Sequence, residues 1–120
     1  SNGAEQIAVA ARDSGMQVVY EGIRLTPEQI VNAAKAGTVD LVGLSILSGS
    51  HIPLATEVCE RLKDAGLSHI PVVVGGIIPQ EDAVRLKNAG VSAVYTPKDF
   101  NMSGIIIDMV DIIMKYEDVA

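Results

Sequence analysis

The sequence predicts an α/β domain in which helices cover both faces of a doubly wound parallel sheet. A unit of apolar run, polar loop, amphipathic helix and glycine recurs along the 120 residues. The hydrophobic fraction of 48% comes mainly from Val, Ile, Ala and Leu rather than aromatic residues. That composition is typical of parallel strands that are buried on both faces. The length corresponds to one domain with a substantial core.

The first predicted helix runs from Gly3 to Ser14, where Asn2 and Glu5 have the spacing of a capping box. A strand candidate, MQVVYEG, follows it at residues 16–22. The next helix lies in the segment TPEQIVNAAKAG. There Thr26 can cap the helix, Pro27 suits the first helical position and Gln29 closes a second capping box.

Three further strand candidates alternate with helices through the rest of the chain. The helix candidates are IPLATEVCERLKDAG, IPQEDAVRLKNAG and the final SGIIIDMVDIIMKYEDVA, whose apolar residues have helical spacing. The strand candidates are TVDLVGLS, IPVVVGG and VSAVYTP. A glycine is expected to end each of the first four helices in the left-handed conformation. These glycines are Gly15, Gly37, Gly66 and Gly90.

The order of these elements favours the flavodoxin-like strand order 2-1-3-4-5. A domain of this kind begins with a strand that lies inside the sheet, whereas this chain begins with a helix. We therefore expect the first strand and its loop to lie upstream of Ser1, so that the chain is an N-terminally incomplete domain.

The charge and cysteine content exclude several classes of function. The net charge of −6 argues against a nucleic-acid partner, because such a surface needs a basic patch. The apolar runs are far shorter than the ~20 residues of a membrane span, and no signal-peptide pattern is present. The single cysteine, Cys59, allows no internal disulfide. We expect a cytoplasmic protein with no membrane or nucleic-acid partner.

Small polar residues gather where the predicted strands end. The stretch from Ser45 to Ser50 follows one strand, and the pair Gly75 and Gly76 ends a neighbouring one. Ligands of open parallel sheets bind at this edge, near the point where the strand order reverses. Two neighbouring strand ends that carry only small side chains suit a large flat or extended ligand better than a metal ion.

Each of these residues also has a purely structural interpretation. Ser45 and Ser48 can satisfy turns, and the glycine pair can make room for the next helix. His51 is more typical of a helix-capping or surface position, and Cys59 of a core position. No Walker loop, GxGxxG, nucleophile elbow or metal-spaced Cys/His cluster occurs. No catalytic residue and no metal ligand is therefore predicted.

The segments TPEQIVNAAKAGTVDLVGLSILSGSH and IPVVVGGIIPQEDAVRLKNAGVSAVYTP together resemble the cobalamin-binding domain of acyl-CoA mutases. The resemblance covers nearly the whole chain. It extends to both the methylmalonyl-CoA and the ethylmalonyl-CoA mutases. SNGAEQIA near the start and YTPKDF near the end are closer to the ethylmalonyl-CoA branch.

The resemblance implies a set of cofactor-binding residues. In this family the benzimidazole tail of cobalamin leaves cobalt and inserts between the sheet and its helices. An upstream D-x-H-x-x-G motif supplies the histidine that replaces it. Only the last glycine of that motif falls within this chain, and its aspartate and histidine would lie just upstream of Ser1. The residues that correspond to the tail site are Ser45, Leu47, Gly75, Gly76 and Gly3, with Tyr95 and Thr96 as weaker candidates.

The resemblance also implies a function for the parent enzyme. Adenosylcobalamin would start a radical rearrangement, of ethylmalonyl-CoA to methylsuccinyl-CoA or, as the alternative, of methylmalonyl-CoA to succinyl-CoA. The partner would be an acyl-CoA-binding barrel, as a domain or a subunit, in a homo-oligomeric parent. This domain would hold the cofactor without being catalytic alone.

Two other classes share the fold. A receiver domain needs an aspartate at the end of its third strand, and no acid lies between Leu41 and Ser50. A cobalamin carrier for methyl transfer usually has an extra helical bundle before the histidine motif, so the upstream sequence would separate it from a mutase.

Overall fold

A computed structural model describes residues 3–19, 25–99 and 101–119 of the chain. Within them, three parallel strands form one sheet in the order β1-β2-β3. The strands are β1 (Val42–Ile46), β2 (Val72–Gly76) and β3 (Ala93–Tyr95). This arrangement matches the last three strands of the predicted order, and the parallel α/β class is confirmed.

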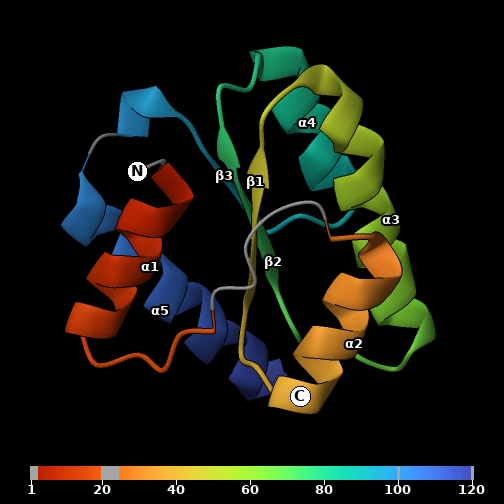
Figure 1. Ribbon diagram of the computed structural model, residues 1–120, viewed down its shortest axis with the longest axis horizontal. Helices are drawn as coiled ribbons and strands as arrows, with labels where there is room; N and C mark the ends of the chain where they lie inside the picture. The colour runs from red at the N-terminus through yellow and green to blue at the C-terminus, as the bar shows by residue number, and fades with distance from the viewer. Residues whose placement is uncertain (1–2, 20–24, 100, 120) are drawn as a thin grey trace.

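Helices lie on both sides of the sheet (Figure 1). Two of them pack against each other on one side. The other three lie on the opposite side, as Figure 1 shows, and two of them form the crossovers between the described strands. The first pair is α1 (Gly3–Asp13) and α5 (Met102–Val119), and the second group is α2 (Pro27–Gly37), α3 (Ile52–Asp64) and α4 (Gln80–Asn88). Short 3-10 turns, η1 (Gly49–His51) and η2 (Pro97–Asp99), follow β1 and β3.

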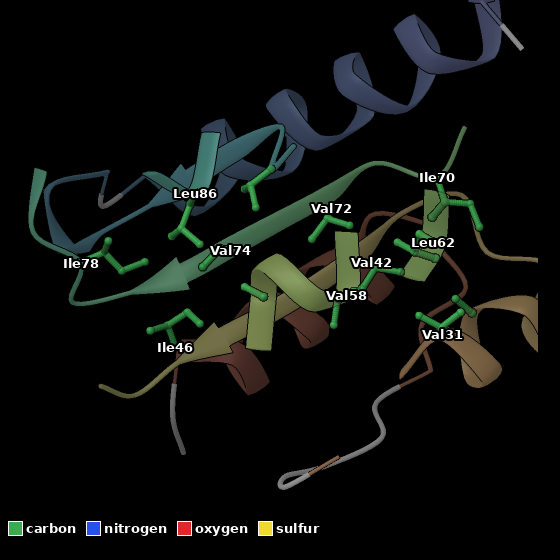
Figure 2. Packing of buried hydrophobic residues seen from close by; sticks show 13 residues of the cluster. Val31, Val42, Ile46, Val58, Leu62, Ile70, Val72, Val74, Ile78 and Leu86 are labelled. Atoms are coloured by element: carbon green, nitrogen blue, oxygen red, sulfur yellow. The ribbon is translucent and has the colours of Figure 1, made fainter. Parts of the chain in front are cut away.

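The main core lies between the sheet and the second group of helices. Figure 2 shows Val74 of β2 beside Leu86 of α4, with Val58 of α3 over the same face of the sheet. These three side chains are fully buried. The opposite layer has a much smaller cluster, in which the buried residues are Ala11, Ile106 and Met109. The side of the sheet facing α1 and α5 is therefore the less completely filled of the two.

The predicted start of α2 is confirmed in detail. The Thr26 hydroxyl accepts a hydrogen bond from the Gln29 amide at 3.1 Å, and the Thr26 amide donates to Gln29 Oε1 at 2.9 Å. Pro27 occupies the first turn, where its missing N–H costs nothing. Asn2, one member of the capping pair predicted for α1, lies outside the described residues.

The predicted helix ends are right in three cases and wrong in one. Gly15, Gly66 and Gly90 have positive φ values of 101°, 75° and 116°. The prediction for Gly37 is wrong, because α2 includes this residue and Thr38 takes the left-handed conformation instead, at φ 49°. From there the Val39 amide donates back to the carbonyl of Ala34 at 3.3 Å, so the reversal occurs one residue later than expected.

The strand predicted at residues 16–22 is absent from residues 16–19, the described part of that segment. Residues 16–19 are irregular, and residues 20–22 lie outside the described part of the chain. A strand needs a hydrogen-bonded neighbour, and among the described residues β1 has none on its outer side. Val18 and Met16 instead pack against the smaller cluster. No helix in the described ranges is both long and apolar enough to cross a membrane.

Candidate functional site

The ends of the three strands bring Ser45, Gly75 and Tyr95 into one row. Ser45 pairs in register with Gly75, and Gly75 pairs with Tyr95. Side chains alternate along a strand, and Ile46 of β1 points into the main core. Ser45, Gly75 and Tyr95 therefore face the other side of the sheet, toward α1 and α5. Tyr95 packs against the smaller cluster on that side, which confirms the direction.

Small residues leave this side of the sheet open near the row. We call the surface formed by Gly43, Ser45, Gly75 and Tyr95 the open face. A Cβ added at Gly75 would lie 3.8 Å from the Tyr95 carbonyl oxygen, and one at Gly43 would lie 3.8 Å from Val73 Cγ2. Both distances are ordinary van der Waals contacts. The packing of the fold therefore does not require a glycine at either position.

Gly76 differs from its neighbour in the predicted pair. Its φ is +152°, and an added Cβ would lie only 2.3 Å from the carbonyl oxygen of Ile46. No L-residue with a side chain fits there without a backbone shift. The close approach of β2 to β1 thus explains Gly76, whereas it leaves Gly75 unexplained. The two glycines of the pair have separate physical roles.

The Ser45 hydroxyl is available for a ligand. Its residue is exposed, and within the described part of the chain no hydrogen bond involves its side chain. Ser48, by contrast, is engaged locally: its hydroxyl lies 2.7 Å from the Ser50 hydroxyl and 3.2 Å from His51 Nδ1. The turn interpretation therefore suits Ser48 but does not account for Ser45. His51 occupies the predicted N-cap position of α3, although its side chain makes no capping hydrogen bond there.

Two large apolar side chains extend beyond the strand ends. Leu47 is 74% exposed and Ile77 is 86% exposed. Each follows one member of the register pair Ile46–Gly76, so the two occupy equivalent positions on neighbouring strands. Leu47 was a predicted site residue, and Ile77 was not. Its position directly after the glycine pair is the sequence signal that would have identified it.

The remaining predicted residues, Gly3 and Thr96, are not part of the open face. Gly3 begins α1, is exposed and has no atom within 4 Å of an added Cβ. Thr96 belongs to a local turn, where its amide donates to Asp99 Oδ2 at 2.8 Å and its hydroxyl accepts from the Lys98 amide at 3.3 Å. Those bonds support a structural role for Thr96. No hydrogen bond within the described part of the chain joins Gly3 to the row.

Among the described residues, Tyr95 makes the only long-range side-chain hydrogen bond of the row. Its hydroxyl donates to Asp108 Oδ2 of α5 at 2.5 Å. Partial burial, this hydrogen bond and the nearby carboxylate charges raise the pKa of Tyr95 well above its ordinary value. The phenol therefore stays protonated and remains a donor at neutral pH. Asp108 could not be predicted as a partner of Tyr95, because the contact joins residues 13 positions apart in different elements.

Cys59 is the predicted core cysteine. It packs against the main cluster from α3, and burial raises the pKa of its thiol. A raised pKa lowers the thiolate fraction, so Cys59 is a poor nucleophile. His69 is exposed on the loop before β2.

Comparison with known proteins identifies related sequences. Residues 1–101 match the B12 binding domain family. An ethylmalonyl-CoA mutase of Methylorubrum extorquens is 54% identical over 98% of this chain, and one of Cereibacter sphaeroides is 57% identical over 94%. The chain spans only 17% of the length of either relative. The 2-hydroxyisobutanoyl-CoA mutase small subunit of Aquincola tertiaricarbonis is 38% identical, with 77% of this chain and 68% of that subunit aligned.

Solved structures with the same fold include receiver domains. The receiver domain of the Francisella response regulator 1452 has a TM-score of 0.69 and aligns 93% of this chain with 88% of that one. Its sequence identity is only 13%, so the likeness concerns the fold alone. Sequence similarity to the mutases is far higher and covers the strand ends that form the open face. The chain belongs to the B12-binding domain family.

Proposed function

We propose that this chain is the cobalamin-binding domain of an adenosylcobalamin-dependent acyl-CoA mutase that converts ethylmalonyl-CoA to methylsuccinyl-CoA. The observation that carries the proposal is Gly75. The packing of the fold would accept a side chain at this position, yet the residue is glycine. It lies in register with Ser45, whose hydroxyl has no hydrogen bond among the described residues. Such a position makes sense where a ligand approaches the sheet.

The open face fits the nucleotide tail of cobalamin. Gly43 and Gly75 leave a strip without side chains, against which a flat heteroaromatic base can lie. Ser45 can donate a hydrogen bond to a ring nitrogen of that base. Leu47 provides apolar surface beside it. In this role the residues of the chain bind and orient the tail and keep water from the face that it covers.

The remaining parts of the proposed enzyme lie outside this chain. The histidine that ligates cobalt is expected in the segment upstream of Ser1, in the motif whose last glycine is Gly3. When bound, adenosylcobalamin supplies the radical chemistry that the protein itself cannot perform. An acyl-CoA-binding barrel, as a domain or a subunit of a cytoplasmic homo-oligomer, would hold the substrate. The similarity to two ethylmalonyl-CoA mutases supports that choice of substrate.

An absorbance titration with adenosylcobalamin tests the proposal. It should compare this chain with a longer form that carries the upstream D-x-H-x-x-G segment. We expect the longer form to bind the cofactor with the benzimidazole displaced from cobalt and histidine in its place. If neither form binds at high cofactor concentration, or if the bound cofactor keeps its benzimidazole on cobalt, the proposal is wrong.

The substrate is tested separately on the full-length enzyme. Turnover of ethylmalonyl-CoA should greatly exceed that of methylmalonyl-CoA at equal concentration. The opposite preference would leave the cobalamin site standing and would overturn the proposed substrate.

A further inference from the structure

Two hydroxyl contacts join β3 to α5, one at each end of the strand. Tyr95 at the carboxyl end of β3 donates to Asp108 at 2.5 Å, and Ser92 just before the strand lies 2.7 Å from the Tyr116 hydroxyl. Three strand residues span ~10 Å, and eight helical residues span ~12 Å. The separation of the two contacts along the strand is therefore close to their separation along the helix. Together they hold β3 and α5 side by side, running in opposite directions.

Only one of these contacts lies at the open face. Tyr95 is the last member of the row that begins with Ser45 and Gly75, whereas Ser92 lies at the other end of the strand. Beside the Tyr95–Asp108 contact is an open depression of about 600 Å³ between the end of β3 and the start of α5. Its lining residues are Tyr95, Lys98, Asp99, Asn101, Gly104, Ile105 and Asp108.

The Tyr95–Asp108 contact has the features of a strong positioning interaction. An O–H···O⁻ distance of 2.5 Å is typical of a charge-assisted hydrogen bond. The aromatic ring is half-buried against the smaller cluster, so its body is held by packing and its hydroxyl by the carboxylate. The raised pKa of Tyr95 supports a phenol that keeps its proton.

We propose that Asp108 is a positioning residue of the cobalamin site. Its hydrogen bond to Tyr95 fixes the aromatic ring at the end of the row and sets the spacing between β3 and α5 where the nucleotide tail lies. The inference rests on the proposed function and adds to it a residue of α5 that does not touch the tail. A site whose walls are already in place binds more tightly, because less ordering remains to be done on binding.

Four variants of the longer form test this role, with the dissociation constant for adenosylcobalamin as the readout. Asp108→Ala and Tyr95→Phe should each raise the dissociation constant about tenfold. This is the lower end of the affinity loss seen when a binding residue loses the group that orients it. Asp108→Asn retains an acceptor oxygen and should restore most of the affinity. Tyr116→Phe is the matched control, because it removes the hydroxyl contact at the other end of the same strand.

Denaturation measurements separate positioning from stability. Tyr116→Phe should lower the free energy of unfolding measurably, since it removes a partly buried hydrogen bond, and yet leave cofactor affinity unchanged. Wild-type affinity in Asp108→Ala, or an equal loss of affinity in Tyr116→Phe, would overturn the inference while the proposed function stands. Failure of the wild-type protein to bind would overturn both.

Discussion

Replacing Gly75 by alanine separates ligand binding from folding. The new Cβ would lie 3.8 Å from the nearest atom, the Tyr95 carbonyl oxygen, so the folded state accommodates it. Gly75 is not in the left-handed region, and a compatible glycine-to-alanine change stabilises by about 0.4–1 kcal/mol through the unfolded chain. We expect the free energy of unfolding to stay constant or rise by that amount.

Cobalamin affinity should respond in the opposite direction. The added methyl group stands on the open face, where the base of the nucleotide is proposed to lie. Overfilling a packed site costs about 1–3 kcal/mol, and each 1.4 kcal/mol corresponds to about tenfold in the dissociation constant. The affinity of Gly75→Ala should therefore fall roughly tenfold to a hundredfold in an absorbance titration.

Gly76→Ala provides the matched control for this experiment. Its Cβ would lie 2.3 Å from the Ile46 carbonyl oxygen at a φ of +152°, so the fold itself is strained by about 1–3 kcal/mol or more. Urea denaturation should show a large loss of stability for Gly76→Ala and none for Gly75→Ala. The reasoning is refuted if Gly75→Ala binds cobalamin as well as wild type, or if both variants are destabilised equally.

Other changes probe the hydroxyl, the core, the cap and the tyrosine. Ser45→Ala should weaken cobalamin binding about three- to tenfold, the worth of one hydrogen bond, with an unchanged denaturation midpoint; a shifted midpoint would mean that the hydroxyl serves the fold. Leu86→Ala empties a fully buried position and should lower the free energy of unfolding by about 2–5 kcal/mol; a loss below ~1 kcal/mol would contradict the described core. Thr26→Ala removes the capping box and should cost about 1 kcal/mol, whereas Asn32→Ala, an exposed change in the same helix that leaves the cap intact, should cost nothing. Because the folded state raises the pKa of Tyr95, its contribution is complete below the unfolded pKa of about 10 and is lost as pH rises above that value; denaturation at increasing alkaline pH should show a steeper decline for wild type than for Tyr95→Phe, and parallel declines would count against the assignment.

Local signals made the helices predictable from the sequence. The capping box at Thr26 and three of the four glycine helix ends depend on neighbours within a few residues, and the structure contains them. The strands from Val42 onward were recognisable from their apolar runs, which in β2 consist of buried β-branched residues, as is typical of parallel strands. These features depend little on the rest of the fold.

Features that depend on distant partners were not predictable in the same way. The segment at residues 16–19 has strand composition, but it forms no ladder because a strand exists only beside another. Asp108 is one acid among several on α5, and only the packing of that helix brings it to Tyr95. The distinction between Gly75 and Gly76 also required coordinates, since sequence alone presents them as an equivalent pair.

The most direct measurement compares the affinities of the longer form for adenosylcobalamin and for adenosylcobinamide, which lacks the nucleotide tail, in wild type and Gly75→Ala. If the open face binds the tail, wild type will prefer adenosylcobalamin strongly, and Gly75→Ala will reduce that preference while leaving cobinamide binding intact. Equal affinity of the wild-type protein for the two compounds would contradict the account, because the row from Ser45 to Tyr95 would then contribute nothing to cofactor binding.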